Sequence, residues 1–211
     1  MKRRCTMGHP GFALVAAALL LRAASAEAQI PKASESPYVA PSDQALLVFS
    51  RPRHRQASNV TFRIVNQAGR CLAVLDNGSQ AVAPVWPGTH MLLLITGTAP
   101  PTIQLLQAKV GPGKTYVVQL RARVNIKNPV EVEVLRRGDQ TVEAFPPSVR
   151  DRIPAKPDLR LCTEWVSWKQ SKIQPRAHQA KRNWDEASDE DRNARTVHRK
   201  DGWTAAEVQG P

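Results

Sequence analysis

The chain has 211 residues, with 30 Lys and Arg against 18 Asp and Glu, which gives a net charge of +12 near neutral pH. This length fits one domain of typical size with an extension, so we expect one hydrophobic core. The strongly basic balance favours contact with polyanions, but it does not by itself identify a partner.

Residues 1–28 have the pattern of a secretory signal peptide. Three basic residues near the start lead into an apolar run over 12–21, and small-x-small triplets follow it, so that a signal peptidase would cut after Ala28. The ten apolar residues are too few for a bilayer span, which takes about 20 residues. We therefore expect export to the periplasm or the extracellular medium, with no transmembrane segment in the mature chain.

The pair Arg3-Arg4 leaves the twin-arginine route open, but the residues after it lack the usual apolar pair, which favours the ordinary route. Cleavage removes four basic residues and one acid, so the net charge falls from +12 to +9. An exported protein with this charge meets anionic lipid headgroups and acidic envelope polymers, whereas nucleic acid is not an expected partner.

The cysteines fit an exported protein. Cys5 precedes the apolar run and so cannot be the lipidated residue of a lipoprotein, which leaves Cys71 and Cys162 as the thiols of the mature chain. Because the compartment is oxidising, we predict a disulfide between them. The alternative is two separate buried thiols, since sequence distance does not show whether the Cα atoms come within about 7 Å.

Residues 29–43 contain three prolines and no apolar periodicity, which predicts a linker. From 44 to 137, short β-branched and aliphatic runs alternate with Gly, Pro, Asn and Asp. This pattern predicts an all-β domain, a small antiparallel β-sandwich of about seven strands. The expected strands are 45–49, 59–65, 71–75, 91–95, 103–110, 115–124 and 131–135.

Two of these strands carry further information. The run 45–49 is almost wholly apolar, as in a central strand covered on both faces. The run 115–124 alternates, so Tyr116, Val118 and Leu120 should face inward. Turn residues at 76–79 and 86–89 predict hairpins or bends, and those at 111–114 predict a hairpin turn.

The charged residues of the last two expected strands predict how these strands pair. An antiparallel hairpin centred near Lys127 would place Arg123 opposite Glu131 and Arg121 opposite Glu133. Charge pairs of this kind stabilise a sheet by only about 0.2 to 1 kcal/mol each, but they indicate which residues face each other.

Beyond Arg137 the strand pattern stops. Residues 138–160 contain prolines and predict a second linker, and 161–211 form a charged extension with four of the five tryptophans. Disordered tails seldom hold so many aromatic residues, so we expect a partly helical or irregular extension whose tryptophans pack onto the sandwich. Acids at 188–191 followed by cations up to 199 predict a short helix there.

The sequence gives little support to catalysis or metal binding. No mature-chain histidine has the spacing of a metal-ligand pair, Ser50 lacks the flanking glycines of a nucleophile turn, and we expect no cofactor. The basic run at 51–55 is the one candidate binding site, because Arg51, Arg53 and Arg55 could contact phosphate or carboxylate groups. Its alternative interpretation is a solvated loop between strands.

Three short marks occur in one order: Val48-Phe49-Ser50-Arg51-Pro52, then Pro87-Gly88-Thr89-His90, then Gly113-Lys114-Thr115-Tyr116. Together they resemble the bacterial envelope family known as domain of unknown function twenty-eight forty-six, over about residues 44–124. The proline-glycine turn is also similar to that of small PEGA-type sandwich domains. The resemblance implies a β-sandwich on an exported protein without enzymatic activity, although this chain lacks a lipidation site and adds a C-terminal extension.

We therefore expect a non-enzymatic binding or structural protein of the bacterial envelope. A second hypothesis is recognition of an anionic envelope polymer through the arginine run, and a third is a hydrolase-type enzyme whose site only folding would assemble.

Overall fold

The computed structural model describes residues 36–55, 57–97, 101–122, 130–138 and 144–210, and its compact unit spans Ser34–Pro211. The predicted signal peptide, residues 1–28, lies outside the described residues, as does Arg123 of the predicted charge pairs.

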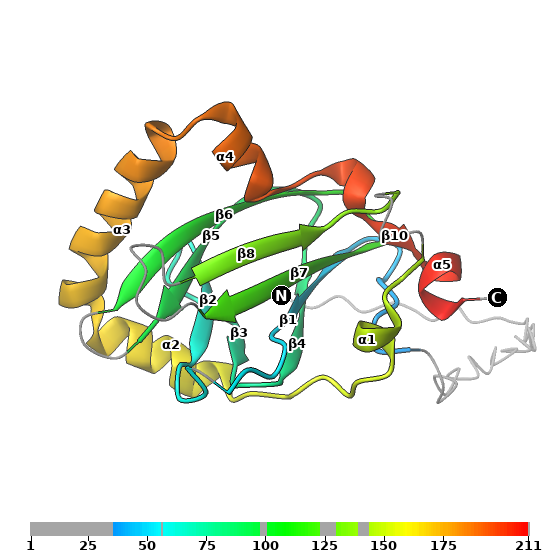
Figure 1. Cartoon of the computed structure of the whole chain (residues 1–211), viewed down its shortest axis with the longest axis horizontal. Coiled ribbons are helices and arrows are strands. Elements are labelled where there is room, and N and C mark those ends of the chain that lie inside the picture. The colour runs from blue at the N-terminus through cyan, green and yellow to red at the C-terminus, as the bar shows by residue number, and fades with distance from the viewer. Residues whose placement is uncertain (1–35, 56, 98–100, 123–129, 139–143, 211) are drawn as a thin grey trace, which may run out of the picture. The chain divides into compact units, whose positions relative to one another are not determined.

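Two five-stranded sheets make up the centre of this unit (Figure 1). The first sheet has the order β4-β1-β7, with β8 and β10 both pairing with the remaining edge of β7. Its strands are β1 (Ala45–Ser50), β4 (Gln80–Val85), β7 (Lys114–Ala122), β8 (Val130–Leu135) and β10 (Trp203–Thr204). The second sheet has the order β3-β2-β5-β6-β9. Its strands are β2 (Phe62–Asn66), β3 (Cys71–Leu75), β5 (Gly88–Thr96), β6 (Thr102–Val110) and β9 (Thr196–Val197).

The β-rich class is confirmed, but the prediction of a purely antiparallel sandwich is wrong. Strand β1 runs parallel to β7, and β6 runs parallel to β9. Parallel neighbours need a long crossover, and four strands of the second sheet lie in sequence between β1 and β7. Residue alternation determines which face of a strand is buried, but it does not determine which neighbour the strand pairs with.

The main core lies between the sheets. Strand β1 contributes Phe49, β2 contributes Phe62 and β5 contributes Leu94, and all three are fully buried. From β7, Tyr116, Val118 and Leu120 are likewise buried, as their alternation predicts.

Both outer faces of the sandwich are covered as well. Helices α2 (Leu159–Trp168) and α3 (Gln170–Asp185) pack on the second sheet and bury a cluster that includes Val166 and Trp184. Helices α1 (Pro147–Arg150) and α5 (Ala205–Gln209), together with Tyr38, Phe145 and Trp203, cover the first sheet. The main core on one face of the first sheet and this cover on its other face explain why all six residues of β1 are buried, which confirms that β1 is central.

The C-terminal segment belongs to both sheets. Strand β9 extends the second sheet and β10 extends the first, so part of the predicted extension is strand. Between α3 and β9 lies α4 (Asp189–Ala194), capped by the Ser188 hydroxyl, which confirms a short helix there, and 3₁₀ helix η1 (Arg199–Asp201) separates β9 from β10. Trp184 and Trp203 are buried as expected, whereas Trp168 is 73% exposed.

Both predicted linkers contain ordered parts. Tyr38, within predicted linker 29–43, is fully buried, and its hydroxyl donates to the carbonyl of Arg152. Helix α1 lies within predicted linker 138–160 and buries Val149. Proline content therefore indicated the breaks in strand periodicity but not the packing of these segments.

The bend predicted at 111–114 is present, but it does not join two paired strands of a hairpin. Gly113 has a φ of 65°, and its N–H donates to the carbonyl of Gln44 at 2.7 Å. The strands on either side, β6 and β7, belong to different sheets, so this turn is not a hairpin. The turn at 76–79 likewise carries the chain from β3 in one sheet to β4 in the other.

The β7–β8 hairpin exists, but its register differs from the prediction by two residues. Arg121 lies opposite Glu131, and Gln119 lies opposite Glu133. The shift of two keeps every side chain on its expected face. Arg121 still reaches Glu133 diagonally, with 2.9 Å between Nη2 and Oε2.

Strand β4 was not predicted, because its six residues include Gln80 and Pro84. Pro84 is tolerated since β4 is an edge strand that pairs only with β1 among the described residues. Gln80 is buried because its side-chain amide donates to the carbonyl of Val149 at 2.9 Å.

Val118→Asp tests the sandwich. The side chain has no solvent exposure and lies between strands β1 and β8, so the change would bury an unpaired carboxylate. We expect a loss of at least about 3 kcal/mol in the free energy of unfolding, measured with urea. Thr89→Asp, an exposed position on β5, is the control and should cost no more than about 0.5 kcal/mol. Equal stability of the two variants would contradict the inward face of β7.

Candidate functional site

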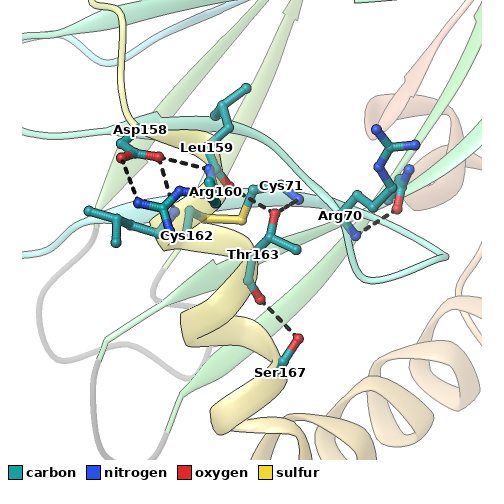
Figure 2. Close-up of a disulfide and its surroundings, with 10 residues drawn as sticks. Arg70, Cys71, Asp158, Leu159, Arg160, Cys162, Thr163 and Ser167 are labelled. Carbon is teal, nitrogen blue, oxygen red and sulfur yellow. Dashed lines mark hydrogen bonds and ion pairs between the residues drawn. A yellow bond between two sulfur atoms is a disulfide. The ribbon is translucent and has the colours of Figure 1, made fainter.

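The predicted disulfide is present and joins the helical layer to a sheet edge (Figure 2). Cys71 begins β3 and Cys162 lies on the buried face of α2, with 6.0 Å between their Cα atoms. Next to the bond, the Cys71 N–H donates to Thr163 Oγ1 at 3.1 Å, which satisfies a backbone donor of an edge strand. Two links at adjacent helical residues therefore determine both the position and the rotation of α2.

The start of α2 is also well defined. Asp158 is the N-cap, and its Oδ1 accepts the N–H groups of Arg160 at 3.0 Å and Leu161 at 3.1 Å. This carboxylate satisfies two of the four backbone donors that a helix leaves unpaired at its beginning. The cap thus fixes the start of α2 at Leu159, three residues before Cys162, whose disulfide attaches the helix to β3.

The outer face of α2 carries a line of apolar side chains. Leu161 is 55% exposed and Trp168 is 73% exposed, and half-buried Trp165 lies between them. The spacing of four and three residues places these side chains on one line along the helix. We call Leu161, Trp165 and Trp168 the α2 stripe, and it is the main concentration of exposed large apolar side chains among the described residues.

Arg51, the first residue of the predicted arginine site, is not available to a ligand. Its side chain is 1% exposed, and its guanidinium donates to the carbonyls of Val60 and, at 2.7 Å, Ala57. It also lies over the ring of Phe62, 5.1 Å from the ring centre. Burial lowers the pKa of Arg51, and Asp76 partly opposes this shift. Arg51 therefore holds the following loop in place.

Arg53 and Arg55 remain exposed. Arg53 lies against Gly78, where an added Cβ would come 3.4 Å from the Arg53 Cβ, so a larger residue at 78 would crowd this arginine. Asn77 fastens the loop by accepting the His54 N–H at 2.9 Å and donating to the His54 carbonyl at 3.0 Å. The structure does not bring the three predicted arginines together as one exposed site.

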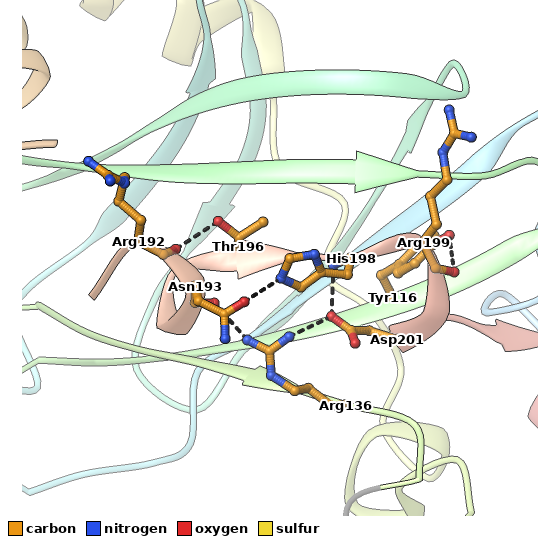
Figure 3. Close-up of polar contacts among 8 residues, drawn as sticks. All are labelled: Tyr116, Arg136, Arg192, Asn193, Thr196, His198, Arg199 and Asp201. Carbon is orange, nitrogen blue, oxygen red and sulfur yellow. Dashed lines mark hydrogen bonds and ion pairs between the residues drawn. The ribbon is translucent and has the colours of Figure 1, made fainter. Parts of the chain in front are cut away.

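A polar cluster that the sequence did not predict surrounds η1 (Figure 3). The buried carboxylate of Asp201 accepts the backbone N–H of His198 at 2.7 Å and Arg136 Nη1 at 2.8 Å. Arg136 Nη2 donates to the Asn193 carbonyl at 2.7 Å, and His198 Nε2 is 2.6 Å from Asn193 Oδ1. The side chain of His198 also accepts the Asp201 N–H, so Nε2 carries the ring proton and donates to Asn193.

This cluster does not have the geometry of an acid–base site. In a nucleophile-activating pair the carboxylate bonds an imidazole nitrogen, whereas Asp201 bonds the backbone of His198. The nearby Tyr116 hydroxyl accepts the Gly111 N–H at 2.8 Å and donates to the Arg199 carbonyl at 3.4 Å. The cluster therefore fixes the turn between β9 and β10, and a Cβ at Gly202 would come within 2.6 Å of the Tyr116 ring.

A hollow of about 740 Å³ lies where α3 and α4 approach β6 and β8. Its charged lining has both signs, with Arg176 and Arg195 among the cations and Glu186 and Asp191 among the acids. Arg195 lies 5.1 Å from the ring centre of Trp184, and burial lowers its pKa while Asp191 opposes the shift. The described lining, with charges of both signs, does not favour one class of ligand.

Among the described residues, no group of three or more His, Cys, Asp or Glu side chains could hold a metal ion. None of the described helices is both long and apolar enough to cross a membrane. No protein-family model and no curated protein matches this chain, so the resemblance to the envelope family stays a prediction.

Sequence reasoning missed the role of Arg51 and the exposure of the α2 stripe. The apolar residues at 161, 165 and 168 were visible, but so were Cys162 and Val166, which lie about 100° further around the same helix. A wide apolar surface on a helix does not show which part of it faces the sheet. The predicted bond to Cys71 was the one signal for the orientation of this helix, because it requires Cys162 to face the sheet.

Arg51→Met should destabilise the protein without removing a binding site. The variant keeps an apolar stem but leaves the carbonyls of Ala57 and Val60 without their buried donor. We expect a loss of about 2 to 3 kcal/mol in the free energy of unfolding, measured with urea. Arg53→Met, the exposed neighbour, should change it by no more than about 0.5 kcal/mol. An unchanged stability of Arg51→Met would contradict the structural role.

His198 should make stability depend on pH. Burial lowers its pKa, Asp201 opposes this, and Arg136, Lys109 and Lys200 add to the lowering. The unfolded chain therefore takes up the proton first as the pH falls, so the contribution is present above about pH 6.5 and is lost as the pH falls through the lower folded-state pKa. The free energy of unfolding of His198→Gln should thus fall less steeply below that pH.

The control is His178→Gln, an exposed position on α3. Urea unfolding of the two variants and the wild type at several pH values separates their slopes. A His198→Gln slope equal to that of the wild type would show that His198 titrates alike in both states.

Proposed function

We propose that this chain is an exported protein of the bacterial envelope, a β-sandwich that binds or organises other envelope components without catalysing a reaction. The disulfide between Cys71 and Cys162 is the observation that carries the proposal. Disulfides persist in oxidising compartments and are rare in the cytosol. The signal-peptide pattern of residues 1–28 supports the same compartment independently.

The use of the polar residues supports binding over catalysis. Asp201, Arg136 and His198 are engaged in fixing a turn, and Arg51 is engaged in fixing a loop. Exposed large apolar side chains gather on α2, in the α2 stripe, whereas Trp86 and Ile153 are exposed elsewhere on the described part of the chain. Surfaces of this kind suit recognition of a partner.

Recognition of an anionic envelope polymer through the arginine run is a weaker alternative. Burial of Arg51 leaves Arg53 and Arg55 as the exposed members of the set. Two exposed side chains on a fastened loop offer a smaller anion site than the sequence predicted, so we do not base the proposed function on them.

Export can be tested on protein recovered from the producing cell. The N-terminus should be Gln29, with Glu27 as the second choice of cleavage site. The protein should occur in the envelope or the medium. Thiol counting on the denatured, unreduced protein should find no free thiol at Cys71 or Cys162. A Cys71→Ala/Cys162→Ala variant is the matched control for the thiol reagent. Protein with an intact Met1 and two free thiols in the cytosolic fraction would refute the proposal.

A further inference from the structure

The α2 stripe is exposed because the helix is not free to rotate. Cys162 and Thr163 are both fastened to the first residue of β3, one by the disulfide and one by the 3.1 Å hydrogen bond. Turning α2 so that Trp168 faced the sheet would break both links. The folded chain therefore holds Leu161 and Trp168 outward, while Trp165 between them is half-buried against the cluster under α2. The exposed apolar surface of the stripe stays available to something outside the chain.

Cations accompany the two tryptophans of the stripe. Lys169 Nζ lies 3.6 Å from the centre of the Trp168 ring, and the Arg63 guanidinium lies 4.0 Å from that of Trp165. Lys172, in the next helical turn, is exposed and makes no ion pair with a described carboxylate. The stripe therefore has aromatic rings with positive charge beside them.

The two nearby acids, Asp158 and Glu164, share one cation. Arg160 Nη1 lies 2.9 Å from Glu164 Oε1, and Arg160 Nη2 lies 4.0 Å from Asp158 Oδ2. Four cations (Arg63, Arg160, Lys169 and Lys172) thus face two acids around the stripe, and the balance of charge there is positive. Figure 1 shows that α2 and α3 meet at a corner of the molecule, and Lys169 lies at their junction.

We propose that the α2 stripe docks this protein on an anionic phospholipid surface, with Trp168 at the level of the headgroups and Lys169 and Lys172 facing lipid phosphates. Tryptophan is enriched at membrane interfaces, where its ring is apolar and its N–H stays hydrated. Lysines beside it extend along apolar surface and keep their ammonium groups in the polar layer. Three side chains in one line at a corner are too narrow for a standard protein interface, which buries about 800 Å² on each partner.

This inference deepens the proposed function by naming the partner class, and it rests on export only in that an exported protein meets such surfaces. Vesicle binding is measured on purified protein and does not depend on export. A failure to bind vesicles would leave the export proposal intact, and a cytosolic location would leave the vesicle result intact.

The test uses oxidised protein beginning at Gln29, which retains the whole compact unit Ser34–Pro211. Co-sedimentation is measured with vesicles of phosphatidylglycerol and phosphatidylcholine in equal parts, and with vesicles of phosphatidylcholine alone. We expect binding to the anionic vesicles that weakens with added salt, and a shift of tryptophan emission to shorter wavelength on binding. Equal binding to both kinds of vesicle, or to neither, would overturn the proposal.

Trp168→Ser tests the stripe itself, and Trp86→Ser is its matched control because Trp86 is similarly exposed, at 65% against 73%, but lies at the bend before β5. Trp168→Ser should weaken vesicle binding several-fold and abolish most of the emission shift, whereas Trp86→Ser should leave both unchanged. Equal effects of the two variants would overturn the proposal, as would self-association of the wild type that Trp168→Ser abolishes.

Lys169→Gln/Lys172→Gln tests the charge. Each lysine near an anionic surface strengthens binding about fivefold, so the double variant should bind about 25-fold more weakly. The control, Lys156→Gln/Lys200→Gln, changes two exposed lysines outside α2 and α3 and removes the same net charge. If both double variants weaken binding to the same extent, the attraction comes from net charge alone and the docking surface is not the α2 stripe. Circular dichroism and thiol counting confirm that each variant is folded and oxidised.

Discussion

The bond between Cys71 and Cys162 is the constraint on which the helical layer depends. It joins the free edge of the second sheet to a helix 91 residues later in the chain, and in the chain-entropy model a loop of that length corresponds to about 4 to 5 kcal/mol. Because the bond lies at one end of α2, the rest of that helix and the following α3 are laid across the outer face of the sheet. The buried side chains of Val166, Ile173 and Trp184 then complete the layer.

A layer on the outer face of each sheet changes the residue pattern that the strands require. A sandwich with solvated outer faces needs alternating strands, whereas β1 here is buried on both sides and is apolar except for Ser50. Its outward-facing Val48 contacts a cluster built by Tyr38, Phe145 and Trp203, with the rings of Phe145 and Trp203 edge to face at 5.7 Å. The segments before and after the predicted β domain are therefore required for its stability.

The basic composition is divided between structural and surface roles. Arg51 is buried and serves two backbone carbonyls, and Arg136 is paired with the buried carboxylate of Asp201. Such groups contribute to stability because each would cost free energy if left without its partner. Lys169 and Lys172, in contrast, have no carboxylate partner among the described residues and remain available to an anionic surface. Net charge alone did not distinguish these two uses.

The sequence by itself determined the β-rich class, the central place of β1, the inward face of β7 and the cysteine pair. These follow from alternation, apolar content and the number of thiols, which are local or compositional properties. The tertiary structure decided which strands are parallel, that 111–114 joins two sheets, that Arg51 is buried and that the α2 stripe faces outward. Each of these depends on contacts between residues far apart in the chain, and neither alternation nor turn chemistry specifies the partner across such a distance.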